Sequence, residues 1–331
     1  ILDLGQLWMG KVRGTLERRS LVEADLRTPE ARGLRERLAD LLAVDLPEQL
    51  RSALEDLQRI LETANLEGRI AWIEQFRDGN ETLQSAPRDV APLLADCLYQ
   101  RFRTTLLLPP GDLPSFRAIL PTETEPSFLH AAGDAADIPL LHEADRGVTL
   151  DRLLGHVDGN VIALIASKRV IEQLFVQHAE RLEAEGVTLI AQGLSGGLGR
   201  MQAEFLAAPN PAVWLLTPWM YEGVELPPGT VDHLWISALP FDHPSQVVLA
   251  ERAQRYRNGF EEYMLPRLLH RLFRLLRTYA LHRKRDGDVL LLDERIWTRE
   301  YGGVIREYLR ALTRVERKAR GATPGAGASG K

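Results

Sequence analysis

The 331-residue chain contains a single cysteine, Cys97, and no long apolar segment. One cysteine can neither form a disulfide bond within the chain nor supply the four thiolates of an iron–sulfur cluster, and its scarcity predicts a reducing, cytoplasmic location. No apolar run approaches the ~20 residues that a membrane-spanning helix requires, so we expect no membrane partner. The first residues lack the charged-then-apolar order of a secretory signal. The start at Ile1 rather than Met predicts a fragment or a processed product.

Motifs for nucleotide and metal binding are missing as well. The sequence has no G-x-x-x-x-G-K-[ST] loop and no Asp-Glu-Ala-His box. The loop holds nucleotide phosphates and the acidic box supports magnesium, so we expect no ATP hydrolysis by this chain alone. His130 and His142 have no partner at metal-ligand spacing and are predicted to be surface histidines. We expect no metal site.

Charge is spread unevenly along a chain whose net charge is −5. Residues 251–331 carry 19 Lys and Arg against 10 Asp and Glu, whereas residues 1–250 carry 22 against 36. This C-terminal excess of positive charge allows a local basic face for phosphate contacts. A solvated, arginine-rich helical surface fits the same numbers.

Hydrophobic patterns divide the chain into segments of different character. Residues 1–67 have leucines at helical spacing, as in Leu34, Leu38 and Leu41, and predict a helical segment. Residues 68–148 begin with a strand at 68–76 and end in a connector rich in Pro, Glu, Asp, Ala and Gly. Residues 321–331 have the composition of a disordered tail.

Residues 149–320 alternate between strand and helix patterns. Such alternation predicts an α/β fold, with a parallel sheet and helices on both faces. Strands are expected at 161–166, 187–191, 213–217, 233–238 and 289–292, and helices at 170–185, 199–206, 246–258, 261–282 and 300–318.

Functional residues of a parallel sheet lie in the loops beyond the carboxyl ends of its strands. Ser167, Lys168 and Arg169 follow the first strand, where helix amides and a hydroxyl can meet a phosphate. Capping of the helix by Ser167 is the other interpretation. Gln192 opens a glycine-rich stretch, QGLSGGLGR, which lacks the Lys-Ser/Thr of a phosphate loop and is more typical of a surface turn.

The loop after the strand at 213–217 is crowded with aromatic and acidic residues. Trp219 and Tyr221 could stack on nucleic-acid bases or cap the sheet. Glu222 and Glu225 could orient an attacking water or hold backbone amides, or they face solvent. Gly223 allows a close approach of the backbone.

Arginines recur every three residues in the helix expected at 261–282. Arg271, Arg274 and Arg277 are expected to lie along one side of it, where paired guanidinium groups suit a polyphosphate. The competing interpretation is an amphipathic helix with a basic outer face.

The loop and its following strand resemble motif V of the DinG/XPD-like superfamily 2 DNA helicases. The resemblance rests on W-x-x-E-G-V-E-L-P-x-G and on L-P-F-x-x-P at Leu239–Pro244. That family usually has Trp-Glu-Gly-Val-Asp. Here Trp219 is displaced, Tyr221 precedes Glu222, and Glu225 replaces the aspartate.

Two further stretches are similar to motifs of the same family. His270-x-x-Phe273-Arg274-x-x-Arg277 resembles motif VI, Gln-x-x-Gly-Arg-x-x-Arg, whose last arginine is usually taken as the arginine finger. Asp293 and Tyr301-Gly302 match fold markers of the last strand and its surroundings. The motif III strand, expected at 104–108, lacks the family's Thr-Ser-Ala-Thr-Leu.

The resemblance implies three structural parts before the tail. Residues 149–320 would be the RecA-like second motor domain, residues 68–148 the end of the first motor domain and a linker, and residues 1–67 a helical segment or arch-like insertion. The intact protein would be an ATP-dependent helicase moving 5′ to 3′ on single-stranded DNA, with a part in DNA repair. ATP and Mg²⁺ would be held mostly by an upstream P-loop motor domain.

The resemblance also assigns roles to the candidate residues. Nucleotide sensing and catalysis are implied for Arg274, Arg277, Glu222, Gly223 and Glu225, and nucleic-acid contacts for Ser167, Lys168, Arg169, Gln192, Trp219 and Tyr221. The departures at Phe273, Glu225 and motif III favour an alternative, a degenerate helicase-like nucleic-acid-binding or scaffolding module without ATPase activity. An unrelated doubly wound enzyme for a small molecule is a third possibility, for which no nucleophile–base pair stands out.

Overall fold

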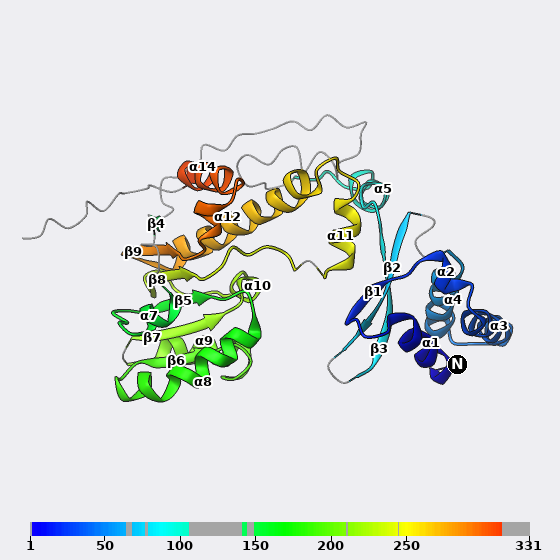
Figure 1. The fold of residues 1–331 in the computed structure, drawn as a ribbon, viewed down its shortest axis with the longest axis horizontal. Helices are drawn as coiled ribbons and strands as arrows, with labels where there is room; N and C mark the ends of the chain where they lie inside the picture. Colours follow the sequence, from blue (N-terminus) through cyan, green and yellow to red (C-terminus); the bar gives the residue numbers. More distant parts are fainter. Residues whose placement is uncertain are drawn as a thin grey trace, which may run out of the picture. The chain divides into compact units, whose positions relative to one another are not determined.

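The computed structural model describes residues 2–63, 68–76, 79–105, 141–143, 149–209, 211–243 and 245–312. The chain forms two compact units, shown in Figure 1. The first unit combines Ile1–Ser127 with Asp242–Pro266, and the second combines Phe128–Phe241 with Arg267–Lys331. None of the described helices is long and apolar enough to cross a membrane. His130, the side chain of His142, Pro244, the tail, and most of the connector and of the strand expected at 104–108 lie outside the described residues.

The first unit is built from helices beside a small antiparallel sheet of order β1-β2-β3. Its elements are α1 (Leu2–Arg13), β1 (Arg18–Ser20), α2 (Glu23–Leu26), α3 (Pro29–Leu42), α4 (Glu48–Thr63), β2 (Arg69–Gln75), β3 (Glu81–Pro87), α5 (Ala91–Leu94), the π-helical turn η1 (Ala95–Tyr99), α11 (Val247–Ala253) and the π-helical turn η3 (Phe260–Met264). The helical segment expected at the N-terminus is confirmed, with one addition. The short strand β1 has no apolar alternation and is fixed by pairing with β2, where Arg18 also forms an ion pair with Glu74 at 2.6 Å.

The core of the first unit forms where leucines recur at helical spacing. Helix α3 begins after Thr28, whose hydroxyl accepts a hydrogen bond from the amide of Ala31, and this cap satisfies one of the helix's free amides. Leu34 and Leu38 of α3 are buried and join Trp8 in one cluster.

Helix α11 belongs to the first unit, although its sequence lies between strands of the second. Glu251 forms an ion pair with Arg88 at 2.9 Å, and Arg255 forms one with Asp89 at 2.9 Å. Arg252 donates to the carbonyl oxygen of Pro87 at 2.8 Å. The strand–helix pattern of 149–320 therefore contains a segment that packs beside β1 and β2.

The second unit contains a six-stranded sheet of order β4-β9-β8-β5-β7-β6, in which all pairings are parallel. Its strands are β4 (Leu141–Glu143), β5 (Val161–Leu164), β6 (Thr188–Ala191), β7 (Ala212–Leu216), β8 (Val231–Ile236) and β9 (Arg283–Leu291). Its helices are α7 (Leu150–Leu154), α8 (Lys168–Ala184), α9 (Leu198–Ala207), α10 (Pro218–Tyr221), α12 (Leu265–His282), α13 (Arg295–Thr298) and α14 (Gly302–Leu312). The predicted α/β fold with a RecA-like parallel sheet is confirmed, and β9 begins earlier than expected.

Helices cover both faces of this sheet, as Figure 1 shows for α8 and α12. Because side chains alternate along a strand, neighbouring residues of β7 face opposite sides. Val213 and Leu215 join the cluster formed with α7 and α8. Trp214 faces the other side, where its ring packs on Phe205 of α9 with centroids 5.5 Å apart. This two-sided burial explains why the strands are continuous apolar runs.

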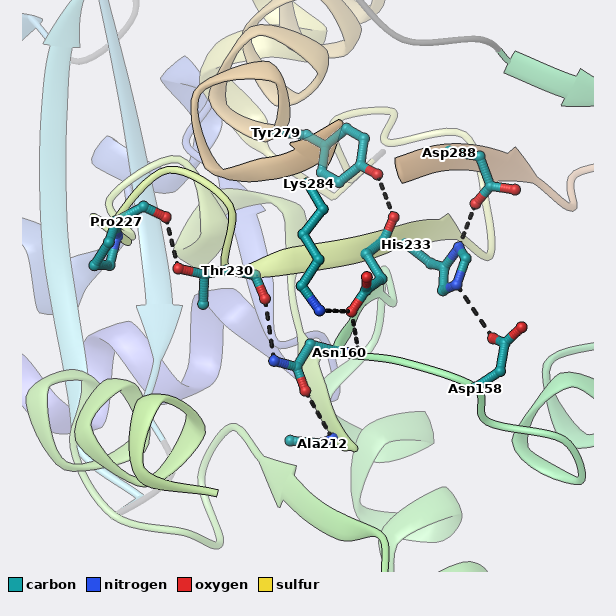
Figure 2. A network of polar contacts seen from close by, with 10 residues as sticks. Asp158, Asn160, Ala212, Pro227, Thr230, His233, Tyr279, Lys284 and Asp288 are labelled. Carbon is teal, nitrogen blue, oxygen red and sulfur yellow. Dashed lines mark hydrogen bonds and ion pairs between the residues drawn. The ribbon is translucent and has the colours of Figure 1, made fainter. Parts of the chain in front are cut away.

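A polar network ties the strands together at the amino end of the sheet (Figure 2). His233 on β8 lies between two carboxylates, with Nδ1 at 2.5 Å from Asp288 and Nε2 at 3.2 Å from Asp158. Asp232 accepts hydrogen bonds from the amide of Asn160 and the amine of Lys284. The network borders an open hollow of 390 Å³, which is lined on one side by Asp158, Asn160, Asp232 and Lys284.

The position of His233 predicts a pH-dependent contribution to stability. The hydrogen bond with Asp288 raises the pKa of His233 above its usual value, against the opposing effect of burial. A raised folded-state pKa means that the stabilisation is complete below the unfolded-state pKa of about 6.5 and is lost as the pH rises through the folded-state pKa. We expect the stability difference between wild type and His233→Gln to shrink as the pH is raised from mildly acidic to alkaline.

Chemical denaturation of both proteins across this pH range measures the effect. His282, whose pKa burial lowers, contributes with the opposite sign but is present in both proteins, so its effect cancels in the comparison. A stability difference that stays constant with pH would show that the pKa of His233 is the same in the folded and the unfolded protein, and would contradict the raised value.

Candidate functional site

The candidate residues lie at the carboxyl edge of the sheet. In a parallel sheet all carboxyl ends meet at the same edge. The loop that contains α10 follows β7 there, and the segment from Ser237 to Phe241 follows β8. Helix α12 places its arginines beside both segments, so the structure brings together the parts that resemble motifs V and VI.

Glu222 pairs with two arginines of α12. Its Oε2 lies 3.1 Å from the Nη2 of Arg274, and its Oε1 lies 3.6 Å from the Nε of Arg271. The side chain of Arg274 is 55% exposed, whereas that of Arg271 is 6% exposed. Within the described part of the chain, this carboxylate is therefore held by guanidinium groups rather than by backbone amides.

Arg271 is the buried centre of this group. Its Nη1 donates a hydrogen bond of 2.8 Å to the carbonyl oxygen of Pro240, and its guanidinium lies over the ring of Trp219, 5.0 Å from the centroid. The expectation that Arg271, Arg274 and Arg277 share one side of the helix is corrected, because Arg271 faces the interior and the other two are exposed. The sequence contains no signal that separates it from its neighbours.

Arg277 is exposed on α12, and its guanidinium makes no hydrogen bond or ion pair with the described residues. Phe273, where the motif VI pattern has glycine, is partly buried. Arg277 and Arg274 thus present two positive charges at the surface, the second of them held by Glu222.

The two aromatic residues of the motif V loop have different environments. Tyr221 has no exposed surface, and its ring lies edge-on to His282 with centroids 6.3 Å apart. Burial raises its pKa well above the ordinary value. The structure therefore contradicts the predicted stacking of Tyr221 on a base, because neither face of its ring is accessible. Trp219 is 39% exposed and remains available, with Arg271 over its ring.

The remaining residues of this loop stay outside the arginine group. Glu225 is exposed, and its backbone carbonyl accepts a hydrogen bond from Gln202. A Cβ added to Gly223 would meet nothing closer than the carbonyl oxygen of Met220 at 3.7 Å, so no described part of the chain requires glycine there.

Ser167, Lys168 and Arg169 are exposed at the start of α8. Ser167 occupies the capping position, but its side chain makes no capping hydrogen bond, which corrects the capping interpretation. The first amides of α8 therefore have no side-chain cap from Ser167.

Gln192 is buried, with 6% of its surface exposed. Its Oε1 accepts a hydrogen bond of 2.8 Å from the amide of Thr217, which joins the ends of β6 and β7. The structure therefore contradicts the predicted nucleic-acid contact of Gln192. Its side chain is buried and instead links the ends of two neighbouring strands. Gly193 and Gly196 have φ angles of 89° and 95°, as in the surface turn that the sequence favoured.

Asp293 fixes the segment that carries Pro240. Its carboxylate accepts hydrogen bonds from the amide of Leu239 at 2.6 Å and from the side chain of Arg295. Burial raises the pKa of Asp293, but the bonds from Arg295 and Leu239 outweigh it and leave the pKa below its usual value. The ring of Phe241 packs edge-on against Tyr301, and the guanidinium of Arg295 lies over the face of the Phe241 ring. These contacts give a physical reason for the L-P-F pattern.

A six-stranded parallel sheet with helices on both faces, and with arginines of a late helix at its carboxyl edge, is the architecture of a RecA-like domain. The helicase C-terminal domain family matches residues 150–311. A curated relative, the 3'-5' exonuclease DinG of Bacillus subtilis (strain 168), is 30% identical over 161 residues, which are 46% of this chain. The chain spans 16% of the length of that relative.

A solved structure of an XPD helicase has the same fold. Its TM-score is 0.53 at 14% sequence identity, over 93% of this chain and 67% of the helicase chain. The family match, the relative and the shared fold together support a C-terminal DinG/XPD-like helicase domain in residues 150–311.

Proposed function

We propose that this chain is the C-terminal motor part of an ATP-dependent DNA helicase, which moves 5′ to 3′ on single-stranded DNA. The observation that carries the proposal is the exposure of Arg274 and Arg277 one helical turn apart, beside the loop that presents Trp219. Guanidinium groups in such a pair stabilise charge on a transferring phosphoryl group. The P-loop motor domain is proposed to lie upstream.

The two motor domains would have different roles in ATP hydrolysis. Arg274 and Arg277 reach the nucleotide phosphates held by the other motor domain. Among the described residues, no group of three or more His, Cys, Asp or Glu side chains is suited to hold a metal ion, so Mg²⁺ is assigned to the P-loop half. When bound, the metal neutralises charge on the β- and γ-phosphates.

DNA contacts are assigned to two neighbouring parts of the carboxyl edge. Ser167, Lys168 and Arg169 bind backbone phosphates, and Trp219 stacks on a base. Gly223 and Glu225 follow Trp219 in the same loop. A role in DNA repair and a cytoplasmic location belong to this proposal.

The experiment that tests the function uses the full-length native protein. We expect single-stranded DNA to stimulate its ATP hydrolysis, and a duplex with a 5′ single-stranded tail to be unwound faster than one with a 3′ tail. ATP hydrolysis without unwinding of either substrate would contradict the helicase assignment, and preference for the 3′ tail would contradict the direction.

Trp219→Ala should weaken binding of single-stranded DNA by about tenfold, since stacking of one base on an aromatic ring contributes ~1–3 kcal/mol. Trp219→Phe keeps a ring and should lose much less. Fluorescence anisotropy with a labelled oligonucleotide measures both affinities. Equal losses for the two variants would show that the ring does not stack on DNA.

The alternative function, a helicase-like binding module without ATPase activity, is favoured by Phe273, which places a large side chain where the motif VI pattern has glycine. Immunoblotting of source-cell lysate with an antibody to this chain distinguishes the two. A band far above 37.2 kDa favours a longer protein with its own P-loop half, and a band at that mass favours the binding module.

A further inference from the structure

Arg271 is a buried cation on α12 with partners in two other segments of the second unit. The residue is 5% exposed, and burial of a charge is costly unless the charge is paired. Glu222 and Trp219 come from the loop after β7, the carbonyl of Pro240 comes from the segment after β8, and Arg271 itself lies on α12. Arg271 therefore joins the separate loops of the carboxyl edge.

Contact with Arg271 restricts the ring of Trp219. The guanidinium lies over the ring at 5.0 Å from its centroid, a distance at which the cation and the ring attract each other. The side chain still exposes 39% of its surface, and this surface is where a base can stack. Fixing the ring before DNA arrives lowers the entropic cost of stacking.

Glu222 connects Arg271 to Arg274. One carboxylate oxygen faces Arg271 at 3.6 Å, and the other faces Arg274 at 3.1 Å. Because the carboxylate is shared, a shift of Trp219 that moves Arg271 also changes how firmly Glu222 holds Arg274. The contacts thus form a continuous chain from the ring that would meet DNA to an arginine that would meet phosphate.

We propose that Arg271 is a positioning residue, which makes the phosphate contact of Arg274 depend on the occupancy of Trp219 by DNA. This proposal rests on the proposed helicase function and names the regulation of that site. Arg271 itself touches neither DNA nor nucleotide. Its effect is carried by the orientation of the Trp219 ring and by the carboxylate of Glu222.

The test compares ATP hydrolysis by the full-length protein with and without single-stranded DNA. In Arg271→Met, which removes the charge and keeps much of the volume, we expect DNA stimulation to fall about tenfold, a typical size for coupling between sites. Hydrolysis without DNA should change by less than about twofold, because the proposed path from Arg271 to the nucleotide runs through Glu222 and Arg274, which both remain in the variant. Arg271→Lys keeps the positive charge at the site and serves as a second variant in case Arg271→Met fails to fold. It should lose part of the stimulation by DNA because lysine lacks the flat guanidinium group.

Arg306→Met is the matched control. The guanidinium of Arg306 lies over the ring of Trp297, 4.9 Å from its centroid, and it also donates to a backbone carbonyl, that of Ile296. The control therefore removes the same kind of stacked arginine from another place in the same unit. We expect it to leave the ratio of stimulated to unstimulated hydrolysis unchanged.

A second measurement uses DNA binding. The effect of Arg271→Met on affinity for a labelled oligonucleotide should disappear in a Trp219→Ala background, since a double-mutant cycle isolates the pairwise term. Equal proportional loss of stimulated and unstimulated hydrolysis in both Arg271 variants, or additive effects in the cycle, would overturn the positioning role. A wild-type protein without any DNA-stimulated hydrolysis would instead contradict the proposed function itself.

Discussion

Arg277→Ala should lower the DNA-stimulated turnover of the full-length protein by about a thousandfold, the lower end of the range for an arginine finger. The guanidinium of Arg277 is exposed and makes no ion pair with the described residues, so it can reach a phosphate without breaking another contact. Its stabilisation is realised as charge develops in the transition state, and the loss should therefore fall on kcat more than on KM.

Arg274→Ala should also lower kcat, but with a different accompanying effect. Arg274 shares Glu222 with Arg271, so its removal leaves the carboxylate to a single arginine. We expect the stimulation by DNA to change in Arg274→Ala and to keep its ratio in Arg277→Ala. Steady-state kinetics at saturating and zero DNA separate the two.

Arg310→Ala provides the control for the loss of one positive charge. Arg310 is exposed in the last turn of α14 and forms no ion pair with Glu222, so its removal should leave kcat and KM unchanged. If Arg274→Ala and Arg277→Ala each left DNA-stimulated hydrolysis at the wild-type rate, the assignment of the arginine finger would be wrong.

The parallel sheet of the second unit was predictable because its strands are buried on both faces. Such strands are short apolar runs between polar or glycine-rich segments, and the runs at β5, β7 and β8 satisfy that pattern. Their order in the sheet and the membership of α11 in the first unit depend on contacts between distant residues. Pairs such as Arg88 with Glu251 leave no periodic signal in the sequence.

The different environments of the α12 arginines follow from helix geometry. A residue turns the helix by about 100°, so a spacing of three falls about 60° short of a full turn. A row with this spacing therefore moves around the helix, which takes it from the buried Arg271 to the exposed Arg277. The three-residue spacing predicts that these arginines point in different directions around the helix. Which of them is buried depends on how α12 packs on the sheet.

The same limit applies to Trp219 and Tyr221. Two residues in one helical turn, two positions apart, point in nearly opposite directions, so only one of them can face the core of the sheet. Helix α10 starts after Thr217, whose hydroxyl accepts a hydrogen bond from the amide of Met220. With the helix starting at this residue, the side chain of Tyr221 points inward. Sequence reasoning could identify the pair but not which ring is accessible.

Gly302 is the position where a single methyl group should cost the most stability. It is the first residue of α14, and a Cβ placed there would lie 2.7 Å from the carbonyl carbon of Ile296 and closer still to its oxygen. Both atoms belong to the backbone, so the clash can be relieved only by moving α13 away from α14. Overpacking of this kind costs ~1–3 kcal/mol, and we expect the upper end because no flexible side chain can yield.

The neighbouring Gly303 offers a matched comparison in the same helix. A Cβ there would meet only the end of the Arg306 side chain, at 3.9 Å. Without a clash, alanine should stabilise the helix by ~0.5–1 kcal/mol through lower backbone entropy in the unfolded chain. Two substitutions of adjacent glycines to the same residue should therefore shift the free energy of unfolding in opposite directions.

Chemical denaturation of the wild type and both variants measures this difference, which we expect to be about 4 kcal/mol between Gly302→Ala and Gly303→Ala. Equal shifts would mean that α13 moves freely relative to α14. Movement of α13 would also reach the site, because Arg295 in α13 binds Asp293, and Asp293 holds the amide of Leu239 beside Pro240. Pro240 supplies the carbonyl that binds Arg271, so a destabilised Gly302→Ala protein should also lose part of its stimulation by DNA. Gly303→Ala should keep that stimulation in full.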